Sequence, residues 1–330
     1  MNNSCYYKVY LPFSKKSIHF RELKTQDQLD IEKINLYYPS TIDYYIEYHQ
    51  NFLKVLNKCV ENFDDLLNCD IVDYILFCTK LRIVSIGDVL ELNIKSEDPK
   101  VKSAKIVINL QDFLQNFLNL TENSLVTKEI EYKEKNLKIE LGWPSLKSVK
   151  DFHNLYFSDM SFHEKVLTTI PEYIKKVTIK NKVIDFQTLN FDQKESVIYK
   201  FPASLKQEIQ NAVLENIKIL ASCDIFEISY FKEQKFNFYN LIYIEIIKLF
   251  FSQNAKRIYE EIYILSNFNM SSEYVLNMSP SERKVYISFI EAQKKSQDPS
   301  PMSEGMQVPT HQGNRTVDDL AVEFGDMPSN

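Results

Sequence analysis

The chain has 330 residues, of which 44% are hydrophobic, enough to bury the cores of about two globular domains. Its 39 Lys and Arg against 45 Asp and Glu give a net charge of -6. Since no five-residue stretch consists mostly of Lys and Arg, the composition excludes nonspecific binding to nucleic acid phosphates as the main activity.

The first 87 residues predict a β-hairpin followed by helices. Two alternating segments, Tyr6–Leu11 and Ser17–Glu22, place apolar side chains on one face, as in a hairpin with one buried side. Helical periodicity then covers three stretches, which are Gln26 to about Leu36, Ser40 or Thr41 to about Asn62, and Asp64 to Ser85. Gly87 is placed to end the third helix, because glycine readily adopts the backbone conformation of a helix C-terminus.

Residues 88–145 predict a small antiparallel β subdomain inserted between helices. Polar and apolar residues alternate in four segments, which are residues 89–94, 105–110, 129–133 and 137–141. A short helical segment, Gln111–Leu120, lies between the second and the third. The subdomain is expected to end at Gly142-Trp143-Pro144, where the sole tryptophan is expected to anchor the packing.

Residues 146–295 predict a helical domain with a short hairpin. The expected elements are helix over residues 146–181 with Pro171 as a helix start, an extended segment over 183–190, helices over 191–199 and 202–220, and a hairpin over 225–230 and 235–239. Long helices follow from Asn240 to Lys295. Within them, Leu241–Phe251 lacks a broad polar face, so it must be covered by protein, either of the same chain or of another copy.

The last of these helices carries a capping box. Ser279 can accept from free backbone N–H groups, Pro280 suits the first helical position, and Glu282 is spaced to reach back. After Lys295 the composition changes, and residues 296–330 predict a disordered, flexible tail.

The tail contains a short amphipathic pattern, and this is the candidate partner-binding site. Its apolar residues share one helical face, and they are Val317, Leu320, Ala321 and Phe324. An isolated helix of this length is unstable in water because nucleation is costly. These residues must therefore dock on the same protein, stay unfolded, or fold in the groove of a partner.

The predicted fold class is α+β, with four parts. It comprises a mainly helical core, an N-terminal β-hairpin, an inserted small antiparallel β subdomain and a disordered C-terminal tail. The parts are residues 1–87 (hairpin and helices), 88–145 (β subdomain), 146–295 (helical domain) and 296–330 (tail).

No motif for catalysis or cofactor binding occurs in the sequence. There is no Gly-x-Ser-x-Gly elbow, Walker loop or dinucleotide fingerprint, and the chain has only 5 glycines to build phosphate-binding loops. His163-Glu164 begins like a zinc-protease helix but lacks the second histidine, and His19, His49 and His153 lie in unrelated predicted elements. Asp64-Asp65 point to different sides of a helix and favour its dipole. We predict no catalytic, cofactor-binding or metal site, and an enzyme with a dispersed active site is the remote alternative.

The cysteines and the N-terminus predict a cytoplasmic protein. The 5 cysteines are odd in number and no pair has the two-residue spacing of a zinc or redox motif, so reduced and mostly buried thiols are expected. The N-terminus has no apolar core of signal-peptide length. The most apolar run, Phe238–Phe251, is shorter than the roughly 20 residues of a membrane span.

Three segments share their layout with one known family. The first comprises Val9-Tyr10-Leu11-Pro12, Ile18-His19-Phe20-Arg21 with the helix after it, and Leu66–Gly87. The second is Leu189–Ile209, with an acidic turn and a helix start at Phe201-Pro202. The third is Ile258–Ile290, where a Tyr-rich helix leads to Leu276-Asn277-Met278-Ser279-Pro280-Ser281-Glu282-Arg283 and a final helix. In these segments the chain resembles the baseplate hub subunit and hub assembly chaperone family of T4-like contractile-tailed phages.

The resemblance implies a non-enzymatic role in building the central hub of a phage tail baseplate, in the cytoplasm of the infected host cell. It implies either an assembly chaperone that binds hub proteins or a permanent structural subunit of the hub in the virion. The expected partners are other tail or baseplate hub proteins, among them the tape-measure protein, with a homo-oligomer as a further alternative. No cofactor, nucleic acid or membrane partner is expected.

Overall fold

The computed structural model describes residues 6–37, 42–94, 104–124, 128–132, 136–147, 170–221, 247, 250–251 and 255–297. The chain divides into two compact units, Met1–Ile287 and Ser288–Asn330. The hairpin expected over 225–230 and 235–239 lies outside the described residues. So does the tail with its four candidate residues, Val317, Leu320, Ala321 and Phe324.

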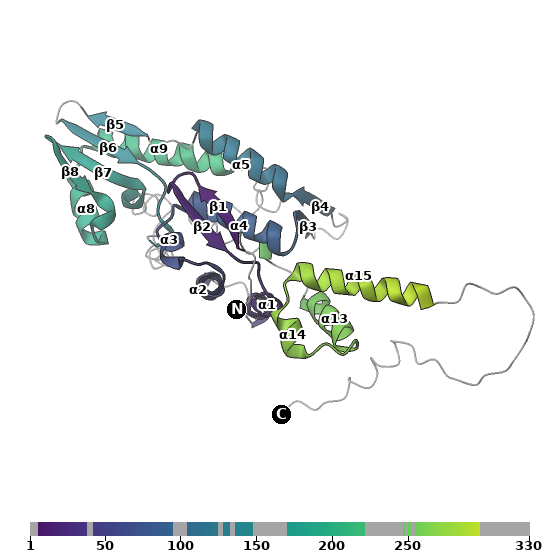
Figure 1. Ribbon diagram of the computed structural model, residues 1–330. Helices are drawn as coiled ribbons and strands as arrows, with labels where there is room; N and C mark the ends of the chain where they lie inside the picture. The colour runs from purple at the N-terminus through teal and green to yellow at the C-terminus, as the bar shows by residue number, and fades with distance from the viewer. Residues whose placement is uncertain are drawn as a thin grey trace, which may run out of the picture. The chain divides into compact units, whose positions relative to one another are not determined.

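The N-terminal hairpin and the helices after it are confirmed. The first elements are β1 (Tyr7–Leu11), β2 (Lys16–Phe20), α1 (Thr25–Tyr37), α2 (Ile42–Cys59), α3 (Phe63–Leu67) and α4 (Ile71–Ser85) (Figure 1). The strands are antiparallel, with Tyr7 opposite Phe20. α4 ends as predicted, because the N–H groups of Ile86 and Gly87 both donate to the Arg82 carbonyl, and Gly87 has a φ of +128°.

The helix predicted from Asp64 to Ser85 is interrupted, forming α3 and α4. The cause is a long-range backbone pairing at the junction. The N–H of Ile71 donates to the Pro144 carbonyl over 2.9 Å, and the N–H of Leu146 donates to the Cys69 carbonyl over 2.9 Å. These groups bond outside the helix, so the helical ladder breaks there.

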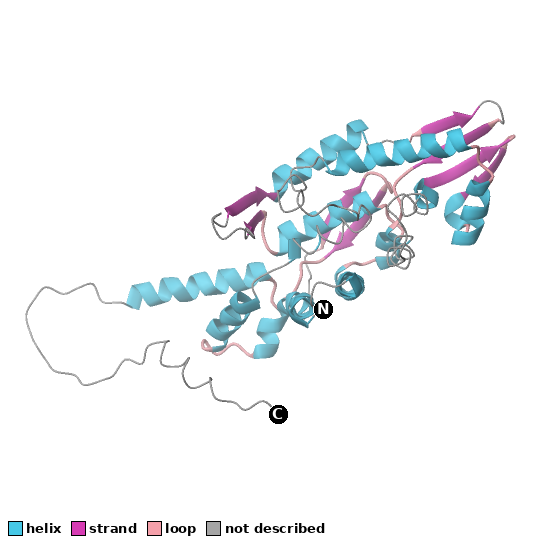
Figure 2. Ribbon diagram, turned by 180° about the vertical axis from the view of Figure 1, so that it is seen from behind, coloured by secondary structure: helices cyan, strands magenta, loops and turns pink. Residues whose placement is uncertain are grey.

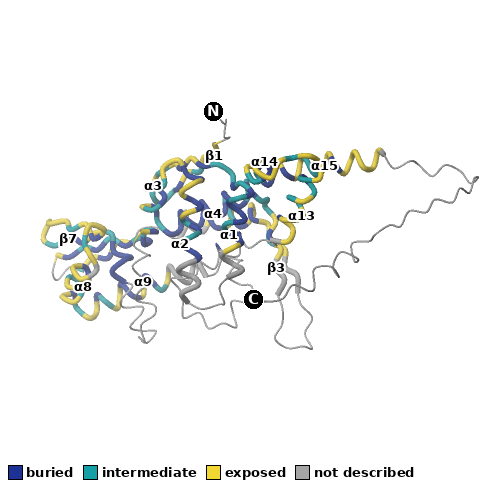
Figure 3. Tube along the Cα trace, turned by 90° about the horizontal axis from the view of Figure 1, so that it is seen from below, coloured by how far each residue is buried: buried dark blue, intermediate teal, exposed yellow. Residues whose placement is uncertain are grey.

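α4 is the central element of the core. Its apolar side chains point in all directions, and both Tyr74 and Phe77 are fully buried. Figure 3 shows α4 almost wholly in the colour of buried residues. The Phe20 ring of β2 meets the Phe77 ring edge-on, with centroids 5.3 Å apart. The hairpin thus packs on one side of this helix, and α5 (Leu110–Ser124) also contacts it.

The predicted β subdomain consists of strands that belong to two different sheets. β3 (Val89–Ile94) and β4 (Ala104–Asn109) form a two-stranded sheet. The other sheet has four antiparallel strands in the order β5 (Glu129–Tyr132), β6 (Leu137–Leu141), β7 (Ile174–Ile179) and β8 (Lys182–Asp185). Figure 2 shows these strands in magenta. The second sheet therefore joins residues on both sides of the boundary expected at 145.

The prediction of helix over residues 146–181 is wrong for β7. Ile174 and Val177 are buried and pair with β6, which supplies the apolar partners that a strand needs. Lys180 and Asn181 have φ angles of +46° and +69°, so they form a two-residue turn with left-handed backbone that leads into β8.

Two predicted helices follow the sheet. A short 3-10 helix, η2 (Phe186–Thr188), leads to α8 (Phe191–Tyr199) and α9 (Ala203–Ala221). α8 begins with a reciprocal capping box between Asn190 and Gln193, which satisfies backbone N–H groups at the start of the helix. α9 contacts α5.

The C-terminal helices are α13 (Ala255–Ser266), α14 (Ser272–Asn277) and α15 (Pro280–Gln297). The predicted capping box is confirmed, since the Ser279 N–H donates to the Glu282 carboxylate over 2.6 Å and the Glu282 N–H donates to Ser279 Oγ over 3.2 Å. Phe250 and Phe251, from the predicted apolar helix, are buried within this chain. The Phe251 ring lies 4.9 Å from the Phe52 ring of α2.

Candidate partner-binding surfaces

The two described histidines that were weighed for chemistry have different surroundings. His19 Nδ1 lies 3.4 Å from the Glu61 carboxylate at the surface, whereas His49 is buried, with its Nε2 3.4 Å from the Tyr74 hydroxyl. His153 and His163 lie outside the described residues. Within the described ranges, no three His, Cys, Asp or Glu side chains gather where they could hold a metal ion.

Three of the five cysteines are free and buried, as predicted. These are Cys59, Cys69 and Cys78, while Cys5 and Cys223 lie outside the described residues. Burial raises the pKa of the Cys59 thiol to about 12. Because the thiolate is the reactive form, these side chains act as small apolar core residues.

A buried arginine ties the C-terminal helices to α1. Arg283 is 2% exposed. Its Nε donates to the Glu261 carboxylate of α13 over 2.9 Å, and its Nη2 donates to the Gln28 side chain of α1 over 2.9 Å. Nη1 donates to the Thr25 hydroxyl. A charged guanidinium with these partners fixes the helices in one arrangement.

Several aromatic side chains face solvent on these fixed helices. Tyr259 and Tyr263 of α13 are 52% and 68% exposed, and Tyr274 of α14 is 53% exposed. Tyr259 and Tyr263 are four residues apart and share a helical face. We call Tyr259, Tyr263 and Tyr274 the aromatic set. Tyrosine is enriched in protein interfaces because it buries a large apolar area and keeps a hydroxyl for hydrogen bonding.

A polar cleft of about 320 Å³ lies between the β1–β2 turn and the four-stranded sheet. Lys175 Nζ of β7 lies 2.6 Å from Asp70 Oδ1, at the start of α4, and both side chains are mostly buried. Burial raises the pKa of Asp70, against the lowering effect of Lys175. Lys16 and Lys176, which also line the cleft, form ion pairs with Asp65 and Glu140, so its charges are largely matched within the protein, which favours a structural role.

Asp73, the next carboxylate along α4, holds the β1–β2 turn. It accepts hydrogen bonds from the N–H groups of Phe13 and Ser14, over 3.3 and 2.6 Å, and from the Ser14 hydroxyl over 2.5 Å. Burial nevertheless raises the pKa of Asp73 to about 6. Its three donors belong to the turn itself, so this carboxylate serves the fold.

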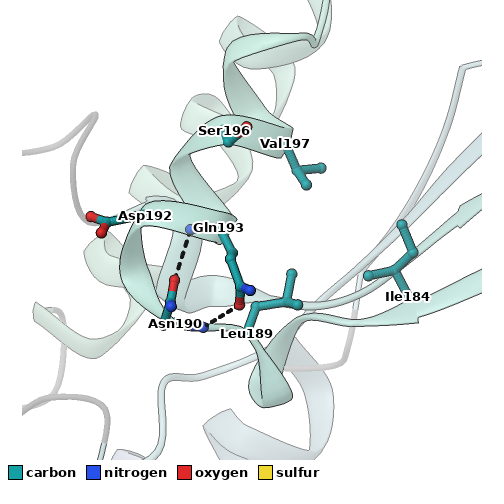
Figure 4. A pocket seen from close by; sticks show the side chains of 7 residues that line it. All are labelled: Ile184, Leu189, Asn190, Asp192, Gln193, Ser196 and Val197. Carbon is teal, nitrogen blue, oxygen red and sulfur yellow. Dashed lines mark hydrogen bonds between the residues drawn. The ribbon is translucent and has the colours of Figure 1, made fainter.

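An apolar groove of about 480 Å³ opens between β8 and α8. Figure 4 shows three apolar side chains directed toward the same space, namely Ile184 of β8, Leu189 before α8, and Val197 of α8. At its rim, the Asn190 side chain accepts from the Gln193 N–H over 2.9 Å, and the Gln193 side chain accepts from the Asn190 N–H over 3.1 Å. The groove can therefore take an apolar group. The sequence predicted both walls, an extended segment over 183–190 and a helix over 191–199, but not how they pack to leave this groove.

A buried ion pair holds the α8 wall of this groove. Lys194 Nζ lies 2.9 Å from both carboxylate oxygens of Glu172, which lies two residues before the start of β7. The two side chains are 9% and 6% exposed. A bidentate pair at such burial fixes α8 beside the sheet.

The comparison with known families decides the identity. A family model described as T4 bacteriophage base plate protein matches residues 5–259, well over half of the chain. The chain belongs to this family. The resemblance seen in the sequence is thereby confirmed at the level of a phage baseplate protein. No curated protein and no solved structure matches the sequence.

The matched region covers only part of the molecule. It includes the four-stranded sheet and the groove of this baseplate protein, and it ends at Tyr259, within α13. Most of the third resembling segment, Ile258–Ile290, therefore lies beyond the match. In the part of the chain with a described structure, no helix is both long and apolar enough to cross a membrane.

Proposed function

We propose that this baseplate protein is a non-enzymatic assembly factor, a chaperone, for the central hub of the phage tail baseplate. It acts by binding other tail or hub proteins in the cytoplasm of the host cell. The observation that carries the proposal is the exposure of the aromatic set, Tyr259, Tyr263 and Tyr274, on helices that a buried Arg283 fixes to the core. A surface that is already ordered loses little conformational entropy when it binds a partner.

The tail residues provide a second proposed contact. Val317, Leu320, Ala321 and Phe324 would fold as a helix in a groove of the partner, connected to the core by the residues after Gln297. Two linked contacts strengthen binding through effective concentration, even where each is weak. This arrangement suits a protein that must hold a partner during assembly and then release it.

Copurification tests the binding role. The full chain would be tagged and coexpressed with each tail and baseplate protein of its phage. We expect the Tyr259→Ala/Tyr263→Ala variant to retain the partner at least about tenfold less well, as for loss of aromatic hot spots. Tyr10→Ala is the matched control, since Tyr10 is 60% exposed on β1. Equal retention by all three proteins would refute the role of the aromatic set.

The second candidate is a permanent structural subunit of the hub, which the family description as a base plate protein supports. Mass spectrometry of purified virions separates the two functions. A chaperone would be absent from virions, whereas a structural subunit would be present at a fixed copy number. Detection at a fixed copy number would therefore replace the chaperone proposal.

A further inference from the structure

The outer edge of β8 has the geometry of a site for an added strand. β8 is the last strand of its sheet, and among the described strands only β7 pairs with it. The two-residue turn makes Ile179 and Lys182 a hydrogen-bonded pair, so the next pair, Thr178 and Val183, is not hydrogen-bonded. The N–H and C=O of Val183 therefore point away from β7.

This edge is accessible and apolar. The Val183 side chain is 59% exposed, which is high for a valine within a strand. On the opposite face of the strand, Ile184 opens onto the groove that Leu189 and Val197 also line (Figure 4). Val183 and Ile184 thus offer apolar contacts on both faces of any strand that pairs with β8.

The charges at this edge specify the kind of partner. Lys180 and Lys182 are exposed, and neither forms an ion pair with another described residue. Since side chains alternate along a strand, Lys182 lies on the same face as Ile184. Asp192, the one acidic residue that lines the groove, points away from Ile184 in Figure 4. The face around Lys182 therefore favours a carboxylate.

We propose that β8 binds an extended segment of a partner protein as an added antiparallel strand, with the sequence apolar-x-acidic. The middle residue pairs with Val183 through both backbone hydrogen bonds. The residue before it lies opposite Ile184 over the groove, and the residue after it lies opposite Lys182. This inference rests on the proposed binding function and names a further surface, other than the aromatic set and the tail.

Peptide binding to the full chain tests the inference. The probe is a fluorescein-labelled nine-residue peptide with Leu-Thr-Glu at its centre, flanked by Gly and Ser, and binding is followed by fluorescence anisotropy. We expect it to bind about two- to fivefold more tightly than peptides with Leu-Thr-Lys or Ser-Thr-Glu at the centre. Lys182→Glu should reverse the preference between Glu and Lys. Equal binding of the three peptides would overturn the proposal.

Two variants at one position separate strand pairing from side-chain contact. Val183→Pro removes the outward N–H, which the pairing with β7 does not use, so the fold tolerates it at this edge. Val183→Thr keeps the N–H and is the matched control. We expect Val183→Pro to reduce peptide binding to background while its circular dichroism melting curve stays close to that of Val183→Thr. Unchanged binding by a folded Val183→Pro protein would refute the added strand.

The outcomes distinguish this inference from the proposed function. If the wild-type chain captures a tail protein through the aromatic set but binds no peptide, only the β8 site is refuted. If it binds the peptide but captures no tail protein, the assembly role fails and the site stands. If the edge instead mediates self-association that Val183→Pro abolishes, a second copy is the occupant and the apolar-x-acidic partner is refuted.

Discussion

Lys175 reaches Asp70 by passing directly over Gly142, and the two charged atoms, Nζ and Oδ1, lie 2.6 Å apart. A Cβ atom at position 142 would lie 2.7 Å from Cε and 2.9 Å from Cγ of Lys175. The absence of a side chain thus makes room for the lysine stem. Through this contact, the four-stranded sheet is joined to the start of α4.

Gly142→Ala should therefore weaken the ion pair. We expect it to lower the free energy of unfolding by about 1–2 kcal/mol, because the lysine stem must move away from the new methyl group. Urea denaturation of the wild type and the variant measures this change. In a Lys175→Ala background the same substitution should cost much less, since the crowded atoms are gone. An equal cost in both backgrounds would contradict the explanation.

Arg283 and Arg257 provide a matched comparison, because both donate to the Glu261 carboxylate. The Arg283 side chain is 2% exposed and that of Arg257 is 70% exposed. We expect Arg283→Ala to cost about 3–5 kcal/mol, since it leaves Glu261, Thr25 and Gln28 without their buried donor. Arg257→Ala should cost less than about 1 kcal/mol. Thermal unfolding of the two variants checks the difference, and similar melting temperatures would disprove it.

The stability of the protein should depend on the protonation of Asp73. Burial raises the pKa of Asp73 from 3.8 to about 6, so the folded state binds this proton more tightly than the unfolded state. Its contribution to stability is therefore fully present below about pH 4 and is lost as the pH rises through about 6. The Asp73→Asn variant has no ionisable group at this position, so it serves as the reference protein.

Urea denaturation from about pH 3.5 to about pH 7 measures this effect. The free energy of unfolding of the wild type, relative to that of Asp73→Asn, should fall by up to about 3 kcal/mol across this range. A constant difference between the two proteins would show that Asp73 does not titrate there.

In the buried pair of Glu172 and Lys194, removing one charge should cost more stability than removing both. Lys194→Met leaves the Glu172 carboxylate buried and unpaired, so we expect a loss of about 3–5 kcal/mol. The double variant Glu172→Leu/Lys194→Met removes both charges and should recover most of that loss. Lys138→Met is the control, since its pair with Glu129 is exposed, with 42% and 53% of the side chains accessible. The decisive result is whether the double variant is more stable than Lys194→Met.

Local signals in the sequence predicted the elements they belong to. The capping box of Ser279 and Glu282 involves residues three positions apart, so spacing alone predicts it. Gly87 likewise predicted the end of α4. The hairpin of β1 and β2 was visible because both strands alternate and lie a few residues apart. The α+β class followed from such patterns.

β7 was missed because its pattern is ambiguous. The spacing of Ile174 and Val177 fits a helix, whereas the spacing of Val177 and Ile179 fits a strand. The signals that favour a strand are the β-branched residues and the Lys180-Asn181 turn, where asparagine tolerates left-handed backbone. The edge of β8 was missed with this strand, because β8 is a sheet edge only through its pairing with β7.

Contacts between distant residues could not be predicted from one sequence. Asp73 meets Ser14 from 59 residues away, and Lys175 meets Asp70 from 105 residues away. Nothing in the local sequence of either partner encodes the other. Pairings of this kind depend on how the elements pack, and they also explain why α3 and α4 are separate helices.

The hydrogen bonds between Arg283 and α1 have a consequence for synthesis on the ribosome. Arg283 follows its partner Thr25 by 258 residues. At elongation rates of about 5–20 residues per second, α1 is synthesised about 10–50 s before the Arg283 guanidinium that donates hydrogen bonds to it. A chain that stops early, before α15 emerges, would therefore leave Thr25 and Gln28 without it, and would be an early target for the proteases of the host.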